Sequence, residues 1–235
     1  GLLVAQLDAE QYLTEYAISD GKTAAVIRHA GKVAGSVAGK SLDQLRAAAT
    51  VAGQDLTTRY TYNALGQVET QISPAGLLTS HTYDLDGRLV STSAGERSAV
   101  SVYDAYGRLK ESRDARGLVA SYSYDANDRL VESTDGRNNT TRYYYDELGR
   151  LTSTVNALGE VSASQYNAFG DATQLTAYTT RIGASTLATL HGGSNKLLAD
   201  AIHAIYNPAL DSSVSRTYDT RGLLETQEEA LGKLT

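Results

Sequence analysis

A seven-residue motif, Tyr-Asp-x-x-Gly-Arg-Leu, returns every 20 or 21 residues through the middle of this chain. Recurrence at a short fixed period is typical of an array in which one supersecondary unit is stacked many times. Three copies are complete, and a fourth has Asp where the others have Gly. The shared positions of these four copies are Tyr83, Asp84, Gly87, Arg88, Tyr103, Asp104, Gly107, Arg108, Tyr124, Asp125, Arg129, Tyr145, Asp146, Gly149 and Arg150. Looser copies begin at Tyr62, at Tyr166 and at Tyr218, the last of which is followed by Asp219 and Gly222.

Each copy predicts one β-hairpin. An alternating stretch rich in β-branched and aromatic residues, such as 119–124, precedes the Tyr-Asp pair and is typical of a strand. The Asp can accept hydrogen bonds from backbone N–H groups ahead of it, and the Gly three residues later can adopt the positive φ of a tight turn. Alternation resumes after the turn, as in 129–134, and indicates the return strand. We therefore expect an all-β fold built from tandem antiparallel hairpins that form a sheet strip.

The Asp and the Arg of the motif vary together among the copies. Each of the four copies above has Arg four residues after its Asp, whereas Asn63 and Asn167 are followed at that spacing by Gln67 and Asp171. Only the looser copy at Asp219 departs from this rule. We infer a charge-assisted hydrogen bond across each turn. An exposed pair of this kind contributes about 0–1 kcal/mol, so its role is to fix register more than to add stability.

Two segments interrupt the array, and both have helical patterns. Residues 41–49 have Ser and Gln at capping-box spacing, followed by an Ala-rich run. Residues 194–205 carry an apolar stripe at helical spacing, which Pro208 ends. With these two short helical insertions the expected organisation is a degenerate repeat plus insertion, the regular array, a second insertion and a resumed repeat, at residues 1–57, 58–174, 175–211 and 212–235.

Composition excludes several classes of partner and chemistry. The net charge of −6 and the pI of about 5.2 are the opposite of what a phosphate backbone attracts, so we expect no nucleic-acid partner. No apolar run approaches the roughly 18–20 residues that span a bilayer, so membrane insertion by this segment is not expected. The chain has no Cys, which removes disulfides, thiolate catalysis and thiolate metal sites.

The sequence offers weak candidates for a metal site or for catalysis. The repeated Asp residues suggest calcium, but each turn provides only one or two carboxylates where a tight site needs more oxygen ligands. We therefore interpret them as turn residues. The four histidines, His29, His81, His191 and His203, have neither the spacing of a metal site nor that of a catalytic triad. We expect no enzyme and no cofactor.

Aromatic usage is lopsided, with 16 Tyr, one Phe and no Trp. One interpretation is that the tyrosines pack between neighbouring hairpins with their hydroxyls reaching solvent. The alternative is that exposed tyrosines stack on sugars, with Tyr143 and Tyr144 as the stacking pair. Exposure of the leading tyrosines separates the two: buried rungs favour a scaffold, and an open aromatic row favours binding.

The motif and its spacing resemble the YD-repeat, or RHS, family. The resemblance covers residues 58–174 well and 212–235 more loosely, whereas residues 1–57 match weakly. It implies hairpins joined into a long strip that forms a hollow β-shell, as in shell-forming parts of bacterial toxin complexes, polymorphic toxins and teneurin-like receptors. Neither the self-cleaving aspartates of the family's core region nor a toxin domain is visible in this sequence.

The same resemblance implies a non-catalytic structural segment of a secreted or cell-surface bacterial protein. Its partners would be the neighbouring repeats of the same polypeptide, together with an encapsulated toxin domain, a cell-surface glycan or a receptor. A carbohydrate- or receptor-binding adhesin module is the alternative function. Both ends of the chain fall inside a module, so we expect the chain to be a piece of a larger protein.

Overall fold

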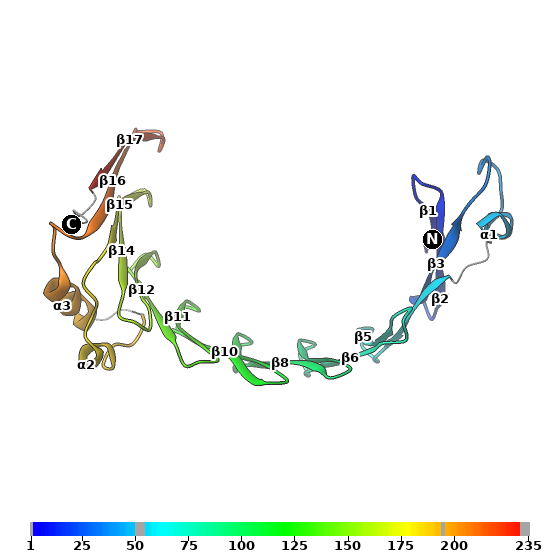
Figure 1. Cartoon of the computed structure of the whole chain (residues 1–235), viewed down its shortest axis with the longest axis horizontal. Helices are drawn as coiled ribbons and strands as arrows, with labels where there is room; N and C mark the ends of the chain where they lie inside the picture. Colours follow the sequence, from blue (N-terminus) through cyan, green and yellow to red (C-terminus); the bar gives the residue numbers. More distant parts are fainter. Residues whose placement is uncertain (1, 50–54, 194–195, 231–235) are drawn as a thin grey trace. The chain divides into compact units, whose positions relative to one another are not determined.

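The computed structural model describes residues 2–49, 55–193 and 196–230, and in these ranges the chain is all-β, with seventeen strands and three short helices (Figure 1). The strands are β1 (Ala5–Leu7), β2 (Tyr12–Ser19), β3 (Lys22–Lys32), β4 (Leu56–Tyr62), β5 (Val68–Ile72), β6 (Leu78–Tyr83), β7 (Leu89–Ala94), β8 (Arg97–Tyr103), β9 (Leu109–Asp114), β10 (Gly117–Tyr124), β11 (Leu130–Asp135), β12 (Thr140–Tyr145), β13 (Leu151–Val155), β14 (Val161–Tyr166), β15 (Ala172–Ala177), β16 (Ser212–Tyr218) and β17 (Leu224–Ala230). The helices are α1 (Leu42–Ala49), α2 (Ala184–Leu187) and α3 (Lys196–Ile205). The predicted all-β hairpin array is confirmed.

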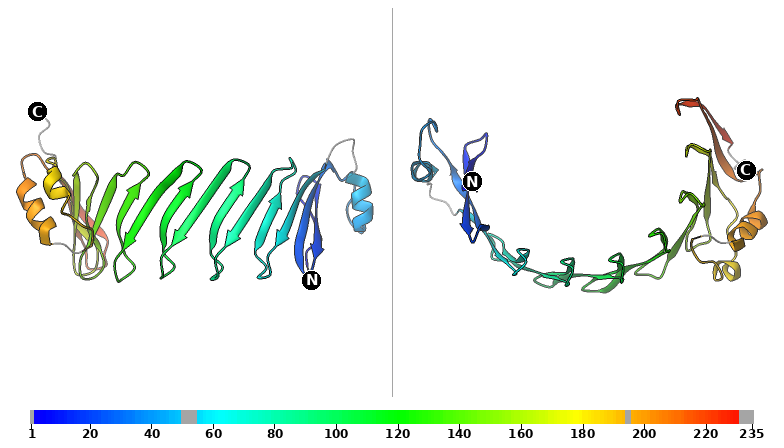
Figure 2. Two further views of the ribbon diagram at one scale, coloured as in Figure 1. Left: turned by 90° about the horizontal axis from the view of Figure 1, so that it is seen from below. Right: turned by 180° about the vertical axis from the view of Figure 1, so that it is seen from behind.

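The strands join into one antiparallel sheet. The chain divides into two compact units, an N-terminal unit (residues 1–102 with 113–116) and a C-terminal unit (residues 103–112 with 117–235). In the N-terminal unit consecutive strands pair from β1–β2 through β7–β8. In the C-terminal unit they pair in the same way from β10–β11 through β16–β17. Figure 2 shows the hairpins within each unit lying side by side.

The turn of each motif forms as its sequence predicts. In the copy at 145–151 the backbone N–H of Asp146 donates to the carbonyl of Arg150 at 3.0 Å, and the N–H of Gly149 donates to the carbonyl of Asp146 at 3.0 Å. The Gly has a φ of 80°, a left-handed conformation that is unfavourable for a residue with a Cβ. In the fourth copy Asp128 takes this conformation, with a φ of 63°.

A β-bulge, which the sequence pattern does not predict, lies just before the leading tyrosine. Register shifts by one residue between Ser123 and Tyr124 against β11, and between Tyr144 and Tyr145 against β13. The same shift occurs in the hairpins that lead with Tyr62, Tyr83, Tyr166 and Tyr218. A bulge re-aims the side chain beside it, so it sets the direction of the tyrosine in each repeat.

The buried apolar residues form one cluster in each unit, and each cluster lies under a helix. In the N-terminal unit Leu13 and Val33 pack with Ala49 of α1. The helix begins with the predicted capping box, in which the N–H of Ser41 donates to Gln44 Oε1 at 2.8 Å. In the C-terminal unit the cluster joins the sheet to α3 and to the segment around α2, and its buried members are Tyr144, Val155, Val161, Ile182, Leu190, Leu198, Ala201 and Ile205.

Helices α1 and α3 lie in the two segments predicted to be helical, and a third helix, α2, is not predicted. The stretch expected to be helical from 194 contains α3, and Ser194 and Asn195 lie outside the described residues, as do residues 231–235 of the expected last repeat. The sequence does not predict the short α2, because four residues are too few to show a helical period. No helix in the described ranges is long and apolar enough to cross a membrane.

Candidate functional site: the joint between consecutive hairpins

The motif residues meet where one hairpin joins the next, at a contact that we call the hairpin joint. In the joint between the copies at 124 and 145, Arg129 binds its own turn through Nε, which lies 2.7 Å from Asp125 Oδ2. Its Nη1 donates to the carbonyl of Asp146 in the next hairpin at 3.2 Å. The guanidinium also lies over the Tyr145 ring, 4.9 Å from the ring centre. One arginine therefore ties two turns together.

The tyrosine returns the contact. The hydroxyl of Tyr145 donates to the carbonyl of Leu130 in the preceding hairpin at 2.7 Å. A bond of the same kind, 2.8 to 2.9 Å long, joins the hydroxyls of Tyr62, Tyr83, Tyr124, Tyr166 and Tyr218 to the carbonyls of Thr23, Val68, Leu109, Leu151 and Ala172. The hydroxyls of these tyrosines thus bind the sheet, and the expectation that they reach out to solvent is wrong.

The arginine half of the joint repeats in the C-terminal unit. Arg108 lies over Tyr124 at 4.8 Å and donates to the carbonyl of Asp125 at 2.9 Å. Arg150 lies over Tyr166 at 4.9 Å and donates to the carbonyl of Asn167 at 2.7 Å. Geometry this regular follows from the fixed register of the hairpins, because the arginine and the next tyrosine always start from the same two ladder positions.

The cross-turn bond inferred from the joint variation of Asp and Arg is confirmed. The carboxylate and guanidinium lie 2.6 to 2.7 Å apart in Asp84–Arg88, Asp104–Arg108, Asp125–Arg129 and Asp146–Arg150. Where Asn replaces Asp, a neutral or mixed pair takes over, with Asn63 Nδ2 3.0 Å from Gln67 Oε1 and Asn167 Nδ2 2.9 Å from Asp171 Oδ2. In the exceptional copy, Asp219 pairs with Arg221 at 2.9 Å.

The turn aspartates are held in their ionised form. Partial burial raises the pKa of Asp125, but hydrogen bonds from the backbone and guanidinium of Arg129 and from the backbone of Asn127 outweigh it and leave the pKa below its usual value. The pKa values of Asp84, Asp104 and Asp146 are lowered against the same effect of burial by their own arginines.

The same bonds bear on the calcium alternative. Oδ1 of Asp125 accepts from two backbone N–H groups, and Oδ2 accepts from the Arg129 guanidinium. A cation would have to displace these donors. Nowhere in the described ranges do three or more His, Asp or Glu residues lie close enough together to hold a metal ion.

The two tyrosines expected to stack on a ligand lie on opposite faces of β12, and neither is openly exposed. Tyr144 is 2% exposed under α3, and burial raises its pKa to about 12. Its hydroxyl is buried without a hydrogen-bond partner. Tyr143 is half-buried, and its hydroxyl lies 3.1 Å from Ser133 Oγ. Burial of Tyr144 rules that side chain out as a stacking platform.

A sequence signal for the burial of Tyr144 exists. It occupies the position just before the leading tyrosine, on the face that the helices cover. The other copies have smaller or polar side chains at this position, namely Thr61, Thr82, Val102, Ser123, Gln165 and Thr217. A large aromatic ring at this one copy marks where an insertion covers the sheet.

The leading tyrosines are half-buried in every copy that the structure describes, neither fully buried rungs nor an open row. In the joints described above, one face of the ring or its hydroxyl is used by the neighbouring hairpin. The motif aspartates and glycines lie at the turns, along one edge of the strip within each unit.

A polar network in the N-terminal unit has no counterpart in the motif. The buried Glu15 accepts from His29 Nε2 at 2.6 Å and from Arg46 of α1, while His29 Nδ1 lies 2.9 Å from Asp55 Oδ2. This network fastens α1 to β2 and β3, and residues so far apart in sequence give no spacing signal. The other histidines lie apart: His81 bonds Thr92 at 3.1 Å, His191 lies 3.8 Å from Glu132, and His203 is exposed on α3.

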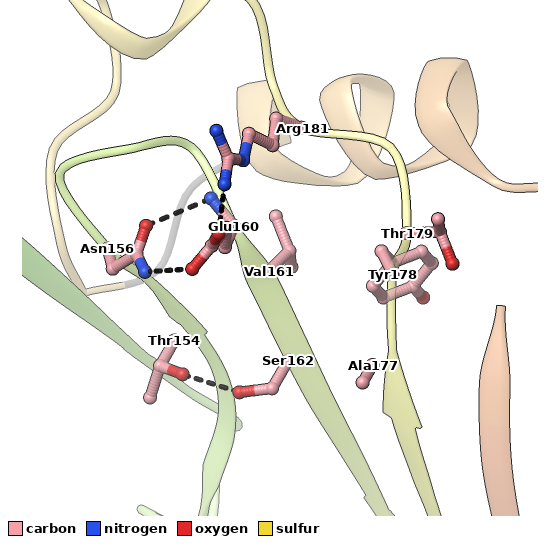
Figure 3. A pocket seen from close by; sticks show the side chains of 9 residues that line it. All are labelled: Thr154, Asn156, Glu160, Val161, Ser162, Ala177, Tyr178, Thr179 and Arg181. Atoms are coloured by element: carbon pink, nitrogen blue, oxygen red, sulfur yellow. Dashed lines mark hydrogen bonds and ion pairs between the residues drawn. The ribbon is translucent and has the colours of Figure 1, made fainter.

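A pocket of about 430 Å³ lies beside the turn between β13 and β14 (Figure 3). Its two charged side chains pair with each other, since Arg181 donates to Glu160 at 2.5 Å, and Asn156 Nδ2 also donates to Glu160 at 2.7 Å. Hydrogen bonds from Asn156 and Arg181 keep the pKa of Glu160 below its usual value. The pocket is a polar recess where the insertion meets the sheet, and its geometry gives no acid–base pair poised for chemistry.

Tandem hairpins locked by a repeated tyrosine, aspartate and arginine define a β-repeat protein whose unit is 20 or 21 residues long. The family described as RHS Repeat matches residues 62–99, 103–140, 124–161 and 145–181. The chain belongs to the RHS repeat family. No curated protein matches it in sequence.

Solved structures share the fold. A crystal structure of TcdB2-TccC3-Cdc42 superimposes with a TM-score of 0.57 at 17% identity, covering 94% of this chain and 11% of that chain. A structure of the Photorhabdus luminescens Tc holotoxin pore, carrying a TccC3 mutation, has a TM-score of 0.58 at 17% identity, covering 97% of this chain and 11% of that chain. The chain thus spans about a tenth of the length of the solved chains that it matches.

Proposed function

We propose that this chain is a non-catalytic structural segment of a large secreted or surface-exposed bacterial RHS protein. In this role its hairpins build part of a β-shell or filament that encloses cargo or presents contact surfaces. The hairpin joint is the observation that carries the proposal. Three consecutive repeats supply Arg108, Arg129 or Arg150 to the next hairpin and accept a tyrosine hydroxyl from it, so a wall can grow by adding repeats without a common core.

The distribution of apolar burial supports a wall more than a globule. The buried apolar residues gather under the helices, whereas the hairpins between them are held by ladder bonds and joints. The fold similarity to TcdB2-TccC3 and to a Tc holotoxin pore supports a toxin-related parent. Enclosure of a toxin domain and export from the cell come to this chain by analogy with the family.

A role without catalysis is part of the same proposal. In the described ranges His29, His81 and His191 contact carboxylates or a threonine, and none is placed between a nucleophile and an orienting carboxylate. The acidic net charge supports a role without nucleic acid. The neighbouring repeats of the same polypeptide are the expected partners, because the hairpin joint binds one repeat to the next.

The experiment uses the natural full-length polypeptide and asks whether the array protects an enclosed region from protease. Arg129→Leu combined with Tyr145→Phe breaks one joint, and Arg137→Leu, at an exposed turn outside any joint, is the matched control. We expect the broken joint to expose cleavage sites that the control and the unchanged protein keep protected. Equal cleavage of all three proteins, or a protein with no protected region, contradicts a shell role.

A further inference from the structure

A histidine in the N-terminal unit lies between two carboxylates. His29 of β3 has its Nε2 2.6 Å from Oε1 of Glu15 on β2, and its Nδ1 lies 2.9 Å from Oδ2 of Asp55, the residue before β4. The imidazole is 12% exposed and the Glu15 side chain 7%, so the contact between them is shielded from water. The three residues lie outside the repeated motif, and the turns of the array do not account for them.

We propose that His29 is a pH-sensitive switch that controls how firmly α1 is bound to the sheet. The helix is held while the imidazole is protonated, and it is loosened when the proton leaves. The proposal is independent of the shell role, because it concerns the helix that interrupts the array and not the hairpin joint.

The geometry of the contact requires a proton on both ring nitrogens. An ionised carboxylate only accepts hydrogen bonds, and a neutral imidazole has a single N–H. Glu15 is ionised, because the hydrogen bond from Arg46 outweighs burial and, with the bond from His29, leaves the pKa of Glu15 below its usual value. Both oxygens of Asp55 are acceptors as well, since Oδ1 accepts from the N–H of Ala30 at 3.0 Å. Only the imidazolium form satisfies both contacts.

Glu15 connects that proton to the helix. Its Oε2 accepts from Arg46 Nε of α1 at 2.8 Å, while its Oε1 faces His29. The helix packs beside β2 and β3 (Figure 1). Among the described residues, the buried apolar cluster that joins α1 to the sheet is smaller than the cluster that joins α3 to it. A small apolar contact leaves the docking of α1 more dependent on its polar contacts.

Loss of the proton turns one attractive contact into a repulsive one. The neutral ring keeps an N–H towards one carboxylate and turns a lone pair towards the other, at a distance below 3 Å in either case. Repulsion at Asp55 loosens the residue that leads into β4, and repulsion at Glu15 disturbs the acceptor of Arg46. Both outcomes weaken the attachment of α1.

The charges around the ring stabilise an imidazolium. Arg28 and Lys32, the other charged residues in this half of β3, lie over the ring of Tyr12 instead, at 5.6 and 5.2 Å from its centre. Acidic groups outnumber basic ones among the side chains bonded to His29 or to its partners. These side chains are Glu15 of β2, Asp55 before β4, and Asp43 and Arg46 of α1.

The insertion of the C-terminal unit provides an internal reference. It is closed by the buried Asp211, whose carboxylate accepts from the backbone N–H groups of Thr179 at 2.9 Å and Asn207 at 2.7 Å. Backbone donors do not change charge near neutral pH. The two histidines of this insertion, His191 and His203, are exposed. Helix α3 should therefore stay attached under conditions in which α1 is loosened.

The test measures amide hydrogen exchange of the full chain by mass spectrometry between about pH 5.5 and about pH 8.5, the range around which histidine side chains change charge. Rates are corrected for the intrinsic effect of pH on exchange. We expect the protection of α1 to fall about tenfold relative to that of α3 as the pH rises. NMR spectra of the imidazole nitrogens should show both of those in His29 protonated at the acid end. An equal change in both helices, or a neutral ring at the acid end, would overturn the proposal.

Two variants distinguish a switch from a purely structural contact. Asp55→Asn offers an amide N–H that a neutral ring nitrogen can accept, so α1 should keep its full protection at about pH 8.5. His29→Gln removes the titrating group and should make the protection of α1 independent of pH. His81→Gln, which removes a histidine bonded to Thr92 on the neighbouring strand β7, is the matched control and should keep the fall. A fall in Asp55→Asn as large as in the unchanged chain, or an unaltered pH dependence in His29→Gln, contradicts the switch.

Discussion

Arg129 covers the ring of Tyr145 at 4.9 Å, and the hydroxyl of Tyr145 reaches back to the carbonyl of Leu130, the residue next to that arginine, at 2.7 Å. Each of the two adjacent hairpins therefore contributes one side chain that contacts the other hairpin, the arginine from the first and the tyrosine from the second. The arginine is also fixed at 2.7 Å by Asp125 of its own turn. The motif is thus a connector between repeats as well as a turn signal.

Replacing the connecting arginine should weaken the array. Arg129→Leu removes the bond to Asp125, the bond to the carbonyl of Asp146 and the cover over Tyr145. We expect the free energy of unfolding to fall by about 1–3 kcal/mol. Urea denaturation followed by circular dichroism measures it. Arg129→Lys should recover only part of the loss, because an ammonium cannot reproduce the planar fork.

The control for this change is Arg137→Leu, at an exposed turn on the other edge of the strip. It should alter the free energy of unfolding by less than about 0.5 kcal/mol. Equal losses at both positions would mean that the joint contributes nothing beyond a surface charge.

The part of the structure that the sequence predicts is local and repeated. The spacing of the tyrosines predicts the hairpins. The cross-turn pair follows from the two copies in which Asn63 and Gln67, or Asn167 and Asp171, stand where the complete copies have Asp and Arg. Both inferences concern interactions within a few residues, which each copy repeats. Comparing the copies within one chain therefore reveals which positions vary together, as comparing related proteins would.

The rest depends on contacts distant in sequence. Burial of Tyr144 requires α3, which begins at Lys196, and Glu15 meets Arg46 of α1 only in the folded unit. The second half of the joint, from arginine to the next tyrosine, crosses from one repeat to another. Hydrophobic periodicity and turn residues carry information only about neighbours in the sequence, so they do not predict pairs of this kind. For this reason the sequence alone leads to the wrong prediction that the tyrosine hydroxyls lie in solvent.

Acid should weaken the C-terminal unit through its turn aspartates. The pKa of Asp125 is lower in the folded chain than the unfolded value of about 3.9, so its contribution is present above that pH and is lost as the pH falls through the folded value. We expect Asp125→Asn to flatten the fall in unfolding free energy below about pH 4. Urea titrations from neutral to acid pH measure the slope, and Asp200→Asn, on the exposed side of α3, should leave it unchanged. A slope that Asp125→Asn does not alter contradicts this assignment.

The insertion is anchored through a glycine with no room for a side chain. A Cβ at Gly192 would overlap the carbonyl oxygen of Val131, whereas one at Gly183 would meet nothing within 4 Å. We expect Gly192→Ala to cost about 2–3 kcal/mol and Gly183→Ala almost nothing. The amide of Gly193, which donates to the carbonyl of Tyr143 at 2.7 Å, should exchange faster with solvent in the first variant only. Equal exchange in both variants would show that the sheet opens readily at this point.

The buried hydroxyl of Tyr144 has no hydrogen-bond partner and therefore lowers the stability of the packing between the insertion and the sheet. Because the hydroxyl is buried without a partner, Tyr144→Phe removes a desolvated polar group and keeps the ring under α3. We expect the free energy of unfolding to rise by about 1 kcal/mol, and Tyr144→Ala to lower it by about 3–5 kcal/mol through the cavity that it leaves. Tyr143→Phe, which removes the bond to Ser133 Oγ, should instead lower it by about 0.5–1.5 kcal/mol. Thermal and urea unfolding of the three variants distinguish these signs, and a loss in Tyr144→Phe as large as that in Tyr143→Phe would mean that the buried hydroxyl has found a partner.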